Sequence, residues 1–324
     1  MRSTPGAVAV GRPILVGVGD AEQTRAALGF AASEAKRCGL AVRLVHVLPR
    51  PSPFLEPAGL VDRRTVQLVG EELVSAAAEH LRRLTSGAVP IESLVQEGAV
   101  GAVLTDLADA ATMVVLQHRE LNAMARVVSG SVVVHVAGRS TVPVVSVPER
   151  WRPRQPVTAV TVAVDGHQGQ DQLLERAFAT AASRGVGLCV LHAWFLGTAY
   201  DELIDSRTPI DQWAKLTHQR VVELTAALRA RYPQVSVQVD VRHQSAADAI
   251  VAAARHSDLL LVGRRHRKHG EHLGPVARAV ITASRVPVMV VPSTALVAAE
   301  AAAQVDDEAD DPVEADRSAG GRSA

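Results

Sequence analysis

The segment ILVGVGD (14–20) has a counterpart in VTVAVDG (160–166), and the fold of the chain can be worked out from this pair. The offset between the two segments is 146 residues, and later segments repeat at the same or nearly the same offset. They are LVHVLP (44–49) with VLHAWF (190–195), MVVLQHR (113–119) with LLLVGRR (259–265), and TVPVVSVP (141–148) with RVPVMVVP (285–292). The last pair is offset by 144, so the second copy has lost two residues between Arg265 and Gly274. The chain therefore contains one folded unit twice.

Each copy alternates short apolar runs with longer helical patterns. The runs predict strands at 13–18, 41–48, 91–96, 112–117 and 143–147, and near 157–164, 187–193, 235–241, 258–262 and 287–291. In the first copy, helices are predicted at about 21–38, 60–86, 100–110 and 128–138. Continuous β-branched runs are typical of strands buried on both faces. The sequence thus predicts an α/β protein of two tandem, doubly wound, Rossmann-like domains, each a five-stranded parallel sheet flanked by helices.

The linker between the copies, ERWRPRQP (149–156), is rich in Pro and Arg. We therefore expect a first domain at 1–148 and a second at 157–293, followed by a tail at 294–324. Prolines bracket the last strand of each copy, which favours a position at the sheet edge. Because open apolar edges promote association, we expect the two last strands to pair in an intramolecular pseudo-dimer, with further homo-oligomerisation left open.

Composition narrows the class of protein. The 324 residues carry 34 Lys and Arg against 34 Asp and Glu, but eight of the acids lie after Ala299. Such an acidic tail with few large apolar residues is predicted to be disordered. Aromatic residues make up only 3%, which argues against stacking platforms for single-stranded nucleic acid. Two cysteines, no secretory signal and no apolar run of membrane-spanning length favour a soluble cytoplasmic protein without membrane or nucleic-acid partners.

With these features the sequence resembles the universal stress protein family over about 290 residues. The resemblance rests on AVDG (163–166), on the histidine after the second strand of each copy (His46, His192), and on the closing P-V-x-V-V-P pattern. It implies a five-stranded parallel sheet that often dimerises through its last strand. It also implies, for the family's ATP-binding members, an Asp after the first strand. After the fourth strand these members carry Gly, two residues, Gly, nine residues, and Gly-Ser/Thr.

The first copy keeps the spacing of this motif and its final Gly130-Ser131, but lacks the residues that contact the ligand. Gly19 stands at the Asp position, and Gln117 and Glu120 stand at the two glycine positions. Side chains there block the close approach of backbone to phosphate, and Glu120 adds negative charge. We therefore interpret the first site as vestigial.

The second copy keeps more of the motif. By the resemblance, Asp165-Gly166 would lie at the ribose, the backbone around Ala193 at the adenine, and Gly263 and Gly274 at the phosphates. It departs from the pattern at His266, which replaces the second glycine, and at Pro275, which removes an N–H and a hydroxyl. Arg264, Arg265 and Lys268 could supply charge in place of those donors. The alternative is that this basic loop is a solvated surface.

Other candidate sites have simpler explanations. His266, His269 and His272 suggest a metal only by composition, because structural zinc normally has Cys or carboxylate partners, so no metal is expected. His46 and His192 are interpreted as hydrogen-bonded core imidazoles. Ser129 and Ser131 are helix-cap candidates. No nucleophile elbow is visible, so no catalytic residue is assigned.

Three functions remain open at this point. The first is a non-enzymatic stress-response protein with a degenerate ATP site in the second copy. The second is an interaction scaffold that has lost nucleotide binding. The third, an enzyme of the wider nucleotide-hydrolase or adenylyl-transfer fold group, has only fold analogy behind it.

Overall fold

The computed structural model describes residues 11–20, 24–48, 62–118, 131–153, 158–166, 170–195, 210–264 and 273–293. The first copy contains β1 (Ile14–Gly17), α1 (Arg25–Cys38), β2 (Val42–Leu48), α2 (Arg63–Thr85), β3 (Ile91–Glu97), α3 (Val100–Ala108), β4 (Met113–His118), α5 (Ser131–Arg139) and β5 (Val144–Pro148). The second contains β6 (Ala159–Val164), α6 (Asp171–Arg184), β7 (Gly187–Trp194), α8 (Ile210–Arg231), β8 (Val237–His243), α9 (Ala246–Ala253), β9 (Leu259–Gly263), α10 (Pro275–Ala283) and β10 (Val288–Val291). The predicted tail lies outside the described residues, and the domain boundaries stay a prediction.

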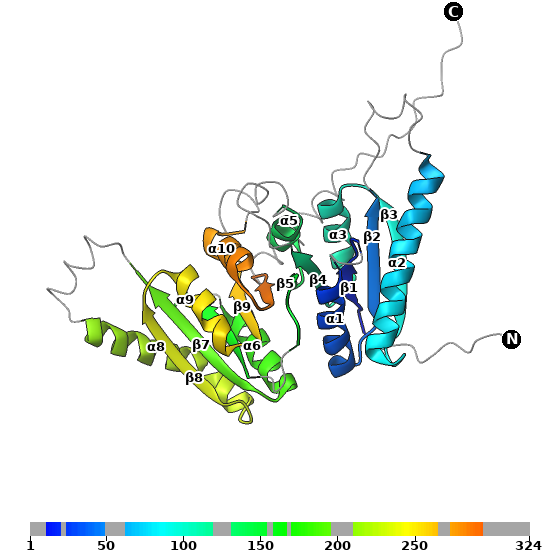
Figure 1. Ribbon diagram of the computed structural model, residues 1–324. Coiled ribbons are helices and arrows are strands. Elements are labelled where there is room, and N and C mark those ends of the chain that lie inside the picture. The colour runs from blue at the N-terminus through cyan, green and yellow to red at the C-terminus, as the bar shows by residue number, and fades with distance from the viewer. Residues whose placement is uncertain are drawn as a thin grey trace, which may run out of the picture.

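The strands form one sheet in the order β3-β2-β1-β4-β5-β10-β9-β6-β7-β8 (Figure 1). Neighbouring strands within a copy run parallel, which confirms the predicted doubly wound α/β fold. Helices α1, α2, α6 and α8 contribute to the core on one face of the sheet, and α3, α5, α9 and α10 to the core on the other. Both copies therefore share two continuous apolar layers.

The first helix of each copy ends in the same way. Gly39 after α1 has φ of 66° and Gly185 after α6 has φ of 65°. This left-handed conformation is the one that favours glycine, and the N–H of each glycine bonds back to the last turn of its helix. The two residues are 146 positions apart in the sequence. The repeat therefore holds at the level of single backbone conformations.

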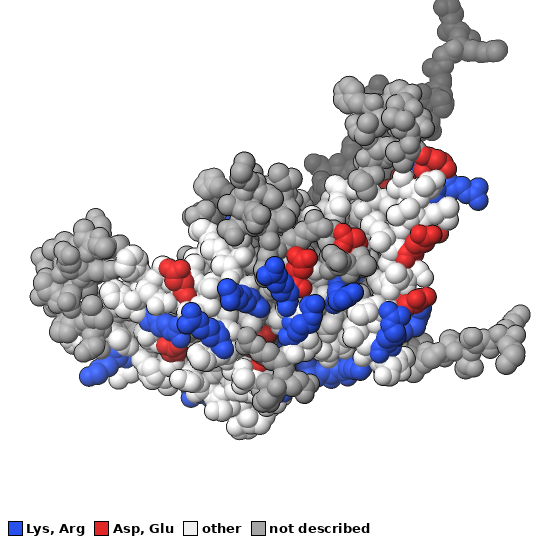
Figure 2. Space-filling view, in the orientation of Figure 1, with Lys and Arg blue, Asp and Glu red and all other residues white. Residues whose placement is uncertain are grey.

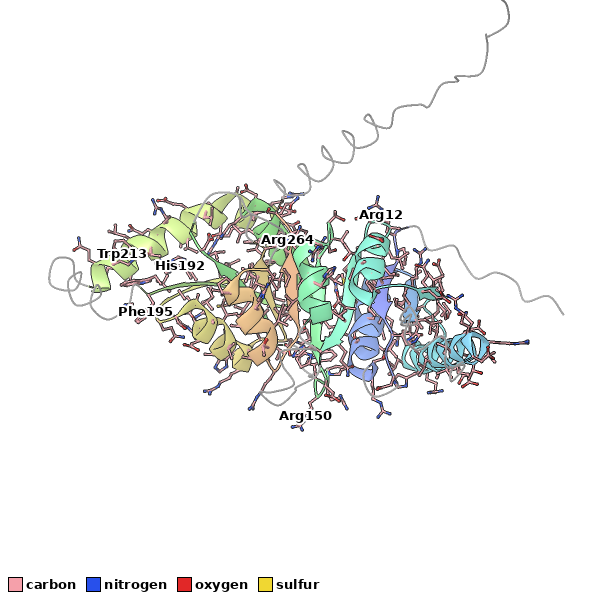
Figure 3. The ribbon with its side chains drawn as sticks, turned by 90° about the horizontal axis from the view of Figure 1, so that it is seen from above. Arg12, Arg150, His192, Phe195, Trp213 and Arg264 are labelled. Carbon is pink, nitrogen blue, oxygen red and sulfur yellow. The ribbon has the colours of Figure 1, made fainter. Side chains whose placement is uncertain are left out.

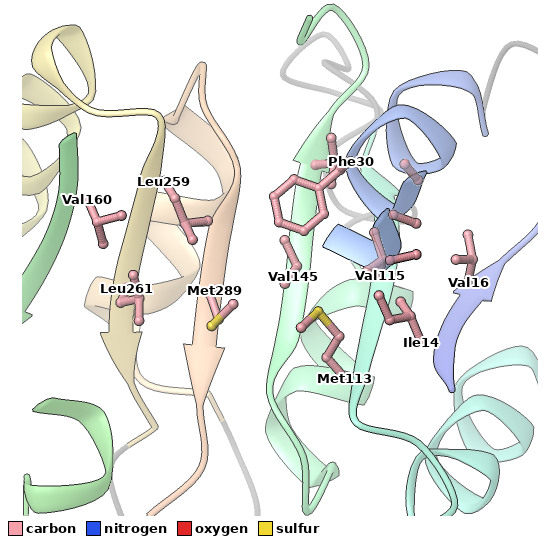
Figure 4. Packing of buried hydrophobic residues seen from close by; sticks show 14 of the residues in the cluster. Ile14, Val16, Phe30, Met113, Val115, Val145, Val160, Leu259, Leu261 and Met289 are labelled. Carbon is pink, nitrogen blue, oxygen red and sulfur yellow. The ribbon is translucent and has the colours of Figure 1, made fainter. Parts of the chain in front are cut away.

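The two copies join through β5 and β10, which pair as predicted and run antiparallel. In this pairing Val145 lies opposite Met289, its own counterpart in the repeat, and Ser146 lies opposite Val288. A pseudo-twofold axis therefore crosses the sheet at the Val145–Met289 pair. Both side chains are buried in a single apolar layer that runs from one copy into the other (Figure 4).

The last strand of each copy lies at the edge of its own half-sheet but at the centre of the whole sheet. Prolines around β5 and β10 predict positions at a sheet edge, and each strand does end the half-sheet of its own copy. In the whole sheet, however, the two strands lie at the centre and are fully buried. The edges of the ten-stranded sheet are β3 and β8, whose residues are half-buried or exposed.

A buried carboxylate reinforces the junction on the α1 side of the sheet. Glu34 of α1 is 3% exposed and accepts hydrogen bonds from Arg37 of the same helix and Arg184 of α6. The Arg184 guanidinium also lies 5.7 Å from the centre of the Phe30 ring, in a cation–π contact. Burial lowers the pKa of Arg184, and the Glu34 carboxylate opposes that shift. Glu34 therefore compensates a positive charge from the other copy.

Replacing Glu34 by Ala should destabilise the fold strongly. The change leaves Arg184 buried without its carboxylate, and breaking a buried ion pair in this way costs about 3–5 kcal/mol. The control is Glu92→Ala, which removes an ion pair between Arg43 and a Glu92 side chain that is 55% exposed. An exposed pair of that kind contributes about 1 kcal/mol or less. Urea unfolding of the two variants measures the difference, and equal losses of stability would contradict the role given to Glu34.

Candidate functional site

A histidine holds the end of the first strand in each copy. The His46 Nδ1 donates to the carbonyl oxygen of Val18 at 2.8 Å, and the His192 Nδ1 donates to that of Val164 at 3.0 Å. A carbonyl only accepts, so the proton is on Nδ1 in both rings. These bonds confirm the predicted hydrogen bonding of both histidines, but both residues are half-buried and do not lie fully within the core. Each fixes the turn that follows β1 or β6.

In the second copy this turn carries Asp165 and Gly166. Gly166 has φ of 75°, and a Cβ built there would lie 3.3 Å from the His192 Cε1, so conformation and space both favour glycine. The Asp165 carboxylate accepts a hydrogen bond from the side-chain amide of Gln170, the residue before α6. Asp165 is half-buried at the carboxyl end of β6.

The end of β9 brings Gly263 to the same edge of the sheet. A Cβ at Gly263 would meet the Leu173 Cδ2, in the first turn of α6, at 3.3 Å. Gly274 is the residue before α10, as predicted, and Pro275 begins that helix. Neither α6 nor α10 receives a side-chain hydrogen bond from the residue at its N-cap. Two helix N-termini and a glycine strand end therefore flank the point where the strand order reverses.

Register gives the order of these groups along the edge. Val164 lies beside His192 of β7, and Ala163 lies beside Val262 of β9, so Asp165 follows level with Ala193 on one side and Gly263 lies close on the other. Neighbouring strands are about 4.8 Å apart. The structure thus brings Ala193, Asp165 and Gly263 into one short row at the carboxyl edge.

Arg264 occupies a different position from the one that a solvated loop would give it. The residue is 4% exposed, and its Nη1 donates to the carbonyl oxygen of Ala137, in α5 of the first copy, at 3.4 Å (Figure 3). Its backbone N–H bonds to the carbonyl of Val291 at 2.8 Å. Arg264 therefore links the copies, and its predicted contact with phosphate stays untested. Sequence reasoning missed this link, because nothing local signals it.

In the first copy, side chains of the protein form hydrogen bonds with the backbone at the corresponding positions. The Gln117 Oε1 accepts from the backbone N–H of Ala26 at 2.8 Å and from that of Ala27 at 3.3 Å, in the first turn of α1. Gln117 is the counterpart of Gly263, and Ala27 is the counterpart of Leu173. The Thr24 hydroxyl accepts from the Gly19 N–H at 3.0 Å and closes the turn after β1. The side chain of Gln117 thus takes the helix donors that an anion would use.

Comparison with known proteins accounts for both copies. The model of the universal stress protein family matches residues 11–148 and again residues 157–292. The chain belongs to the universal stress protein family. A universal stress protein of Mycobacterium tuberculosis (strain CDC 1551 / Oshkosh) is 30% identical over 298 residues, covering 86% of this chain and 94% of the relative. One from Mycolicibacterium smegmatis is 27% identical over 294 residues, covering 86% and 96%. The crystal structure of a universal stress protein from Archaeoglobus fulgidus matches with a TM-score of 0.63 at 16% identity, over 87% of this chain and 97% of that one, which shows the shared fold.

Several predicted site residues of this universal stress protein lie outside the described residues. They are Gly130, Glu120, Arg265, Lys268 and the three histidines His266, His269 and His272, and nothing is described of the Ser131 side chain at the start of α5. Among the described residues, no three His, Cys, Asp or Glu side chains gather as a metal site, and no helix is long and apolar enough to cross a membrane.

A separate cavity of about 310 Å³ lies beside α1, and its lining includes Arg25, Lys36, His80 and Trp151. Burial, together with the nearby Arg83 and Arg25, lowers the pKa of His80. The lining does not include Asp165 or the two glycines of the second copy.

On the face of the molecule shown in Figure 2, basic side chains are interspersed with acidic ones.

Replacing Gln117 by Ala tests the closure of the first site. The variant leaves two first-turn amides of α1 without the side-chain acceptor, which should cost about 1–2 kcal/mol of folding stability. The matched control is Gln67→Ala, which removes an exposed hydrogen bond to Glu71 and should change stability by about 0.5 kcal/mol or less. Chemical denaturation compares them. A Gln117→Ala protein as stable as the control would show that the bond does not cap α1.

Proposed function

We propose that this universal stress protein is a non-enzymatic stress-response protein that binds an adenine nucleotide, ATP in the first instance, at its second copy. The observation that carries the proposal is the contrast between equivalent positions. Where the Gln117 side chain bonds the first turn of α1, Gly263 has no side chain that could bond the first turn of α6. Asp165 stands at the end of β6, and Gly19 stands at the same point of the first copy.

The row at the carboxyl edge would hold the base, ribose and phosphates of a nucleotide in order. Asp165 would accept from the ribose hydroxyls, because a carboxylate is an acceptor only. The backbone at Ala193, on the neighbouring strand, would face the base. Gly263 and Gly274 would admit the phosphates, with the N-termini of α6 and α10 supplying N–H groups and a favourable dipole. The three parts would follow β7, β6 and β9 across the sheet.

The non-enzymatic part of the proposal rests on the residues at this edge. The His192 Nδ1 donates its proton to a backbone carbonyl, so only Nε2 of this ring could act as a general base. The Asp165 carboxylate accepts from the Gln170 amide, and the described residues of the row, Ala193, Asp165 and Gly263, include no second carboxylate. Occupancy by a nucleotide would therefore act through binding, by changing the surface offered to partners.

A second function is supported by Pro275. As the first residue of α10 it has no N–H and no hydroxyl to give to a phosphate, and the loop before it is two residues shorter than in the first copy. These features favour an interaction scaffold that works without nucleotide. The two functions differ in one measurable property, the affinity for ATP.

Calorimetric titration of ATP into the full-length protein and Asp165→Ala tests the proposal. Losing a hydrogen bond to a charged group costs about 1.5–3 kcal/mol, so the variant should bind roughly ten- to a hundredfold more weakly. The matched control is Asp20→Ala, which removes an exposed carboxylate from the equivalent turn of the first copy and should leave affinity unchanged. The assignment fails if Asp20→Ala weakens binding and Asp165→Ala does not. No binding by the unchanged protein at millimolar ATP favours the scaffold.

A further inference from the structure

Aromatic rings gather at the carboxyl ends of β7 and β8. The Trp194 ring, at the end of β7, stacks on the His243 ring, at the end of β8, with 4.0 Å between centroids and 25° between planes. Trp213 of α8 lies 5.7 Å from Trp194, and Phe195 lies 6.1 Å from His243. Three of the chain's nine Phe, Trp and Tyr residues thus form this ring cluster with His243.

The ring cluster is not an ordinary piece of core. Phe195 is 51% exposed and Trp213 is 42% exposed, whereas Phe30 and Phe178 are almost completely buried. The Trp194 Nε1 is buried and has no hydrogen-bond partner among the described residues. Exposed aromatic rings beside a buried N–H donor without a hydrogen-bond partner are typical of a binding surface.

At the equivalent described positions the first copy has no aromatic rings. The counterparts of Trp194, Trp213 and His243 are Leu48, Gln67 and Glu97. In the first copy α2 packs closely on the sheet: a Cβ added at Gly70 would lie only 3.0 Å from the Leu48 Cδ2. The counterpart of Gly70 in α8 is Leu216, which is 56% exposed. The ring cluster therefore belongs to the copy that keeps Asp165 and Gly263.

We propose that the ring cluster is a stacking subsite for the planar base of the nucleotide bound at the second copy. The inference rests on the proposed function and adds the residues that would hold the base. Because Val164 pairs with His192, the ribose position at Asp165 is one strand away from Ala193, and Trp194 comes next along β7. Trp194 in turn pairs with His243 of β8, which places the rings beyond the ribose on the side away from the phosphates.

The two exposed rings border the edge from opposite sides. Figure 3 shows Trp213 on the α8 side of the strands, Phe195 on the other side, and His192 between them. Successive residues of a strand point to opposite faces, so Trp194 and Phe195 present rings to both sides. A base lying across the ends of β7 and β8 would meet an aromatic face. Stacking of this kind tolerates any base and is strongest for large ring systems, which predicts a preference for purine over pyrimidine nucleotides.

The test uses the full-length protein with Trp213→Ala, Phe195→Ala and the conservative Trp213→Phe, each titrated calorimetrically with ATP and with CTP. Gln67→Ala, at the position in the first copy that matches Trp213, is the control. We expect Trp213→Ala and Phe195→Ala each to weaken ATP binding about five- to twentyfold and to narrow the gap between ATP and CTP. Trp213→Phe and Gln67→Ala should stay within about threefold of the unchanged protein, because a ring is retained or was never present.

Tryptophan emission gives a second readout. In a Trp151→Phe background, Trp194 and Trp213 are the remaining tryptophans, and ATP should quench their emission. ATP binding that Asp165→Ala weakens, but that Trp213→Ala and Phe195→Ala leave intact with no quenching, would overturn the stacking subsite while the nucleotide site stands. Absence of ATP binding in the unchanged protein would overturn both.

Discussion

The antiparallel pairing of β5 with β10 is the interaction on which the rest of the molecule depends. It turns two five-stranded sheets into one sheet of ten, with a pseudo-twofold axis at Val145 and Met289. Each strand would otherwise leave a row of backbone donors and acceptors open to other chains. Glu34 and Arg264 fasten the same junction on its two faces, through α6 and α5 respectively. The two copies are thereby joined in one sheet, while the carboxyl ends of the strands of each copy form two separate edges.

This separation lets equivalent positions diverge. Both copies keep the histidine that holds the end of the first strand, at the same offset in the sequence. Around that common turn one copy has Gln117, which bonds the first turn of its own helix, and the other has Gly263 and Asp165. A single side-chain carbonyl oxygen is enough to occupy the amides that would otherwise meet an anion. The two copies therefore differ in their side chains at this edge and share the same backbone fold.

Sequence alone predicted the frame well. The expected strands agree with the structure to within about two residues at each end, because runs buried on both faces leave a clear apolar signal. The hydrogen bonding of His46 and His192, and the position of Gly274 before a helix, were also predicted correctly.

The features that sequence reasoning missed all depend on contacts across the fold. Gln117 caps a helix about 90 residues away in the chain, and Arg264 bonds a carbonyl in the other copy. The ring cluster draws on residues as far apart as Trp194 and His243, so no local pattern could reveal it. The burial of Glu34 likewise depends on Arg184 of α6, which is 150 residues away in the chain.

The central claim is that only the second copy offers its carboxyl edge to a nucleotide. Hydrogen–deuterium exchange of the full-length protein, with and without millimolar ATP, tests it most directly because both copies are observed in one sample. The account predicts slower exchange at the ends of β6, β7 and β9 and in the first turns of α6 and α10, with the ends of β1 and β4 and the first turn of α1 unchanged. Protection at β1, β4 and α1, or at neither copy, would contradict it.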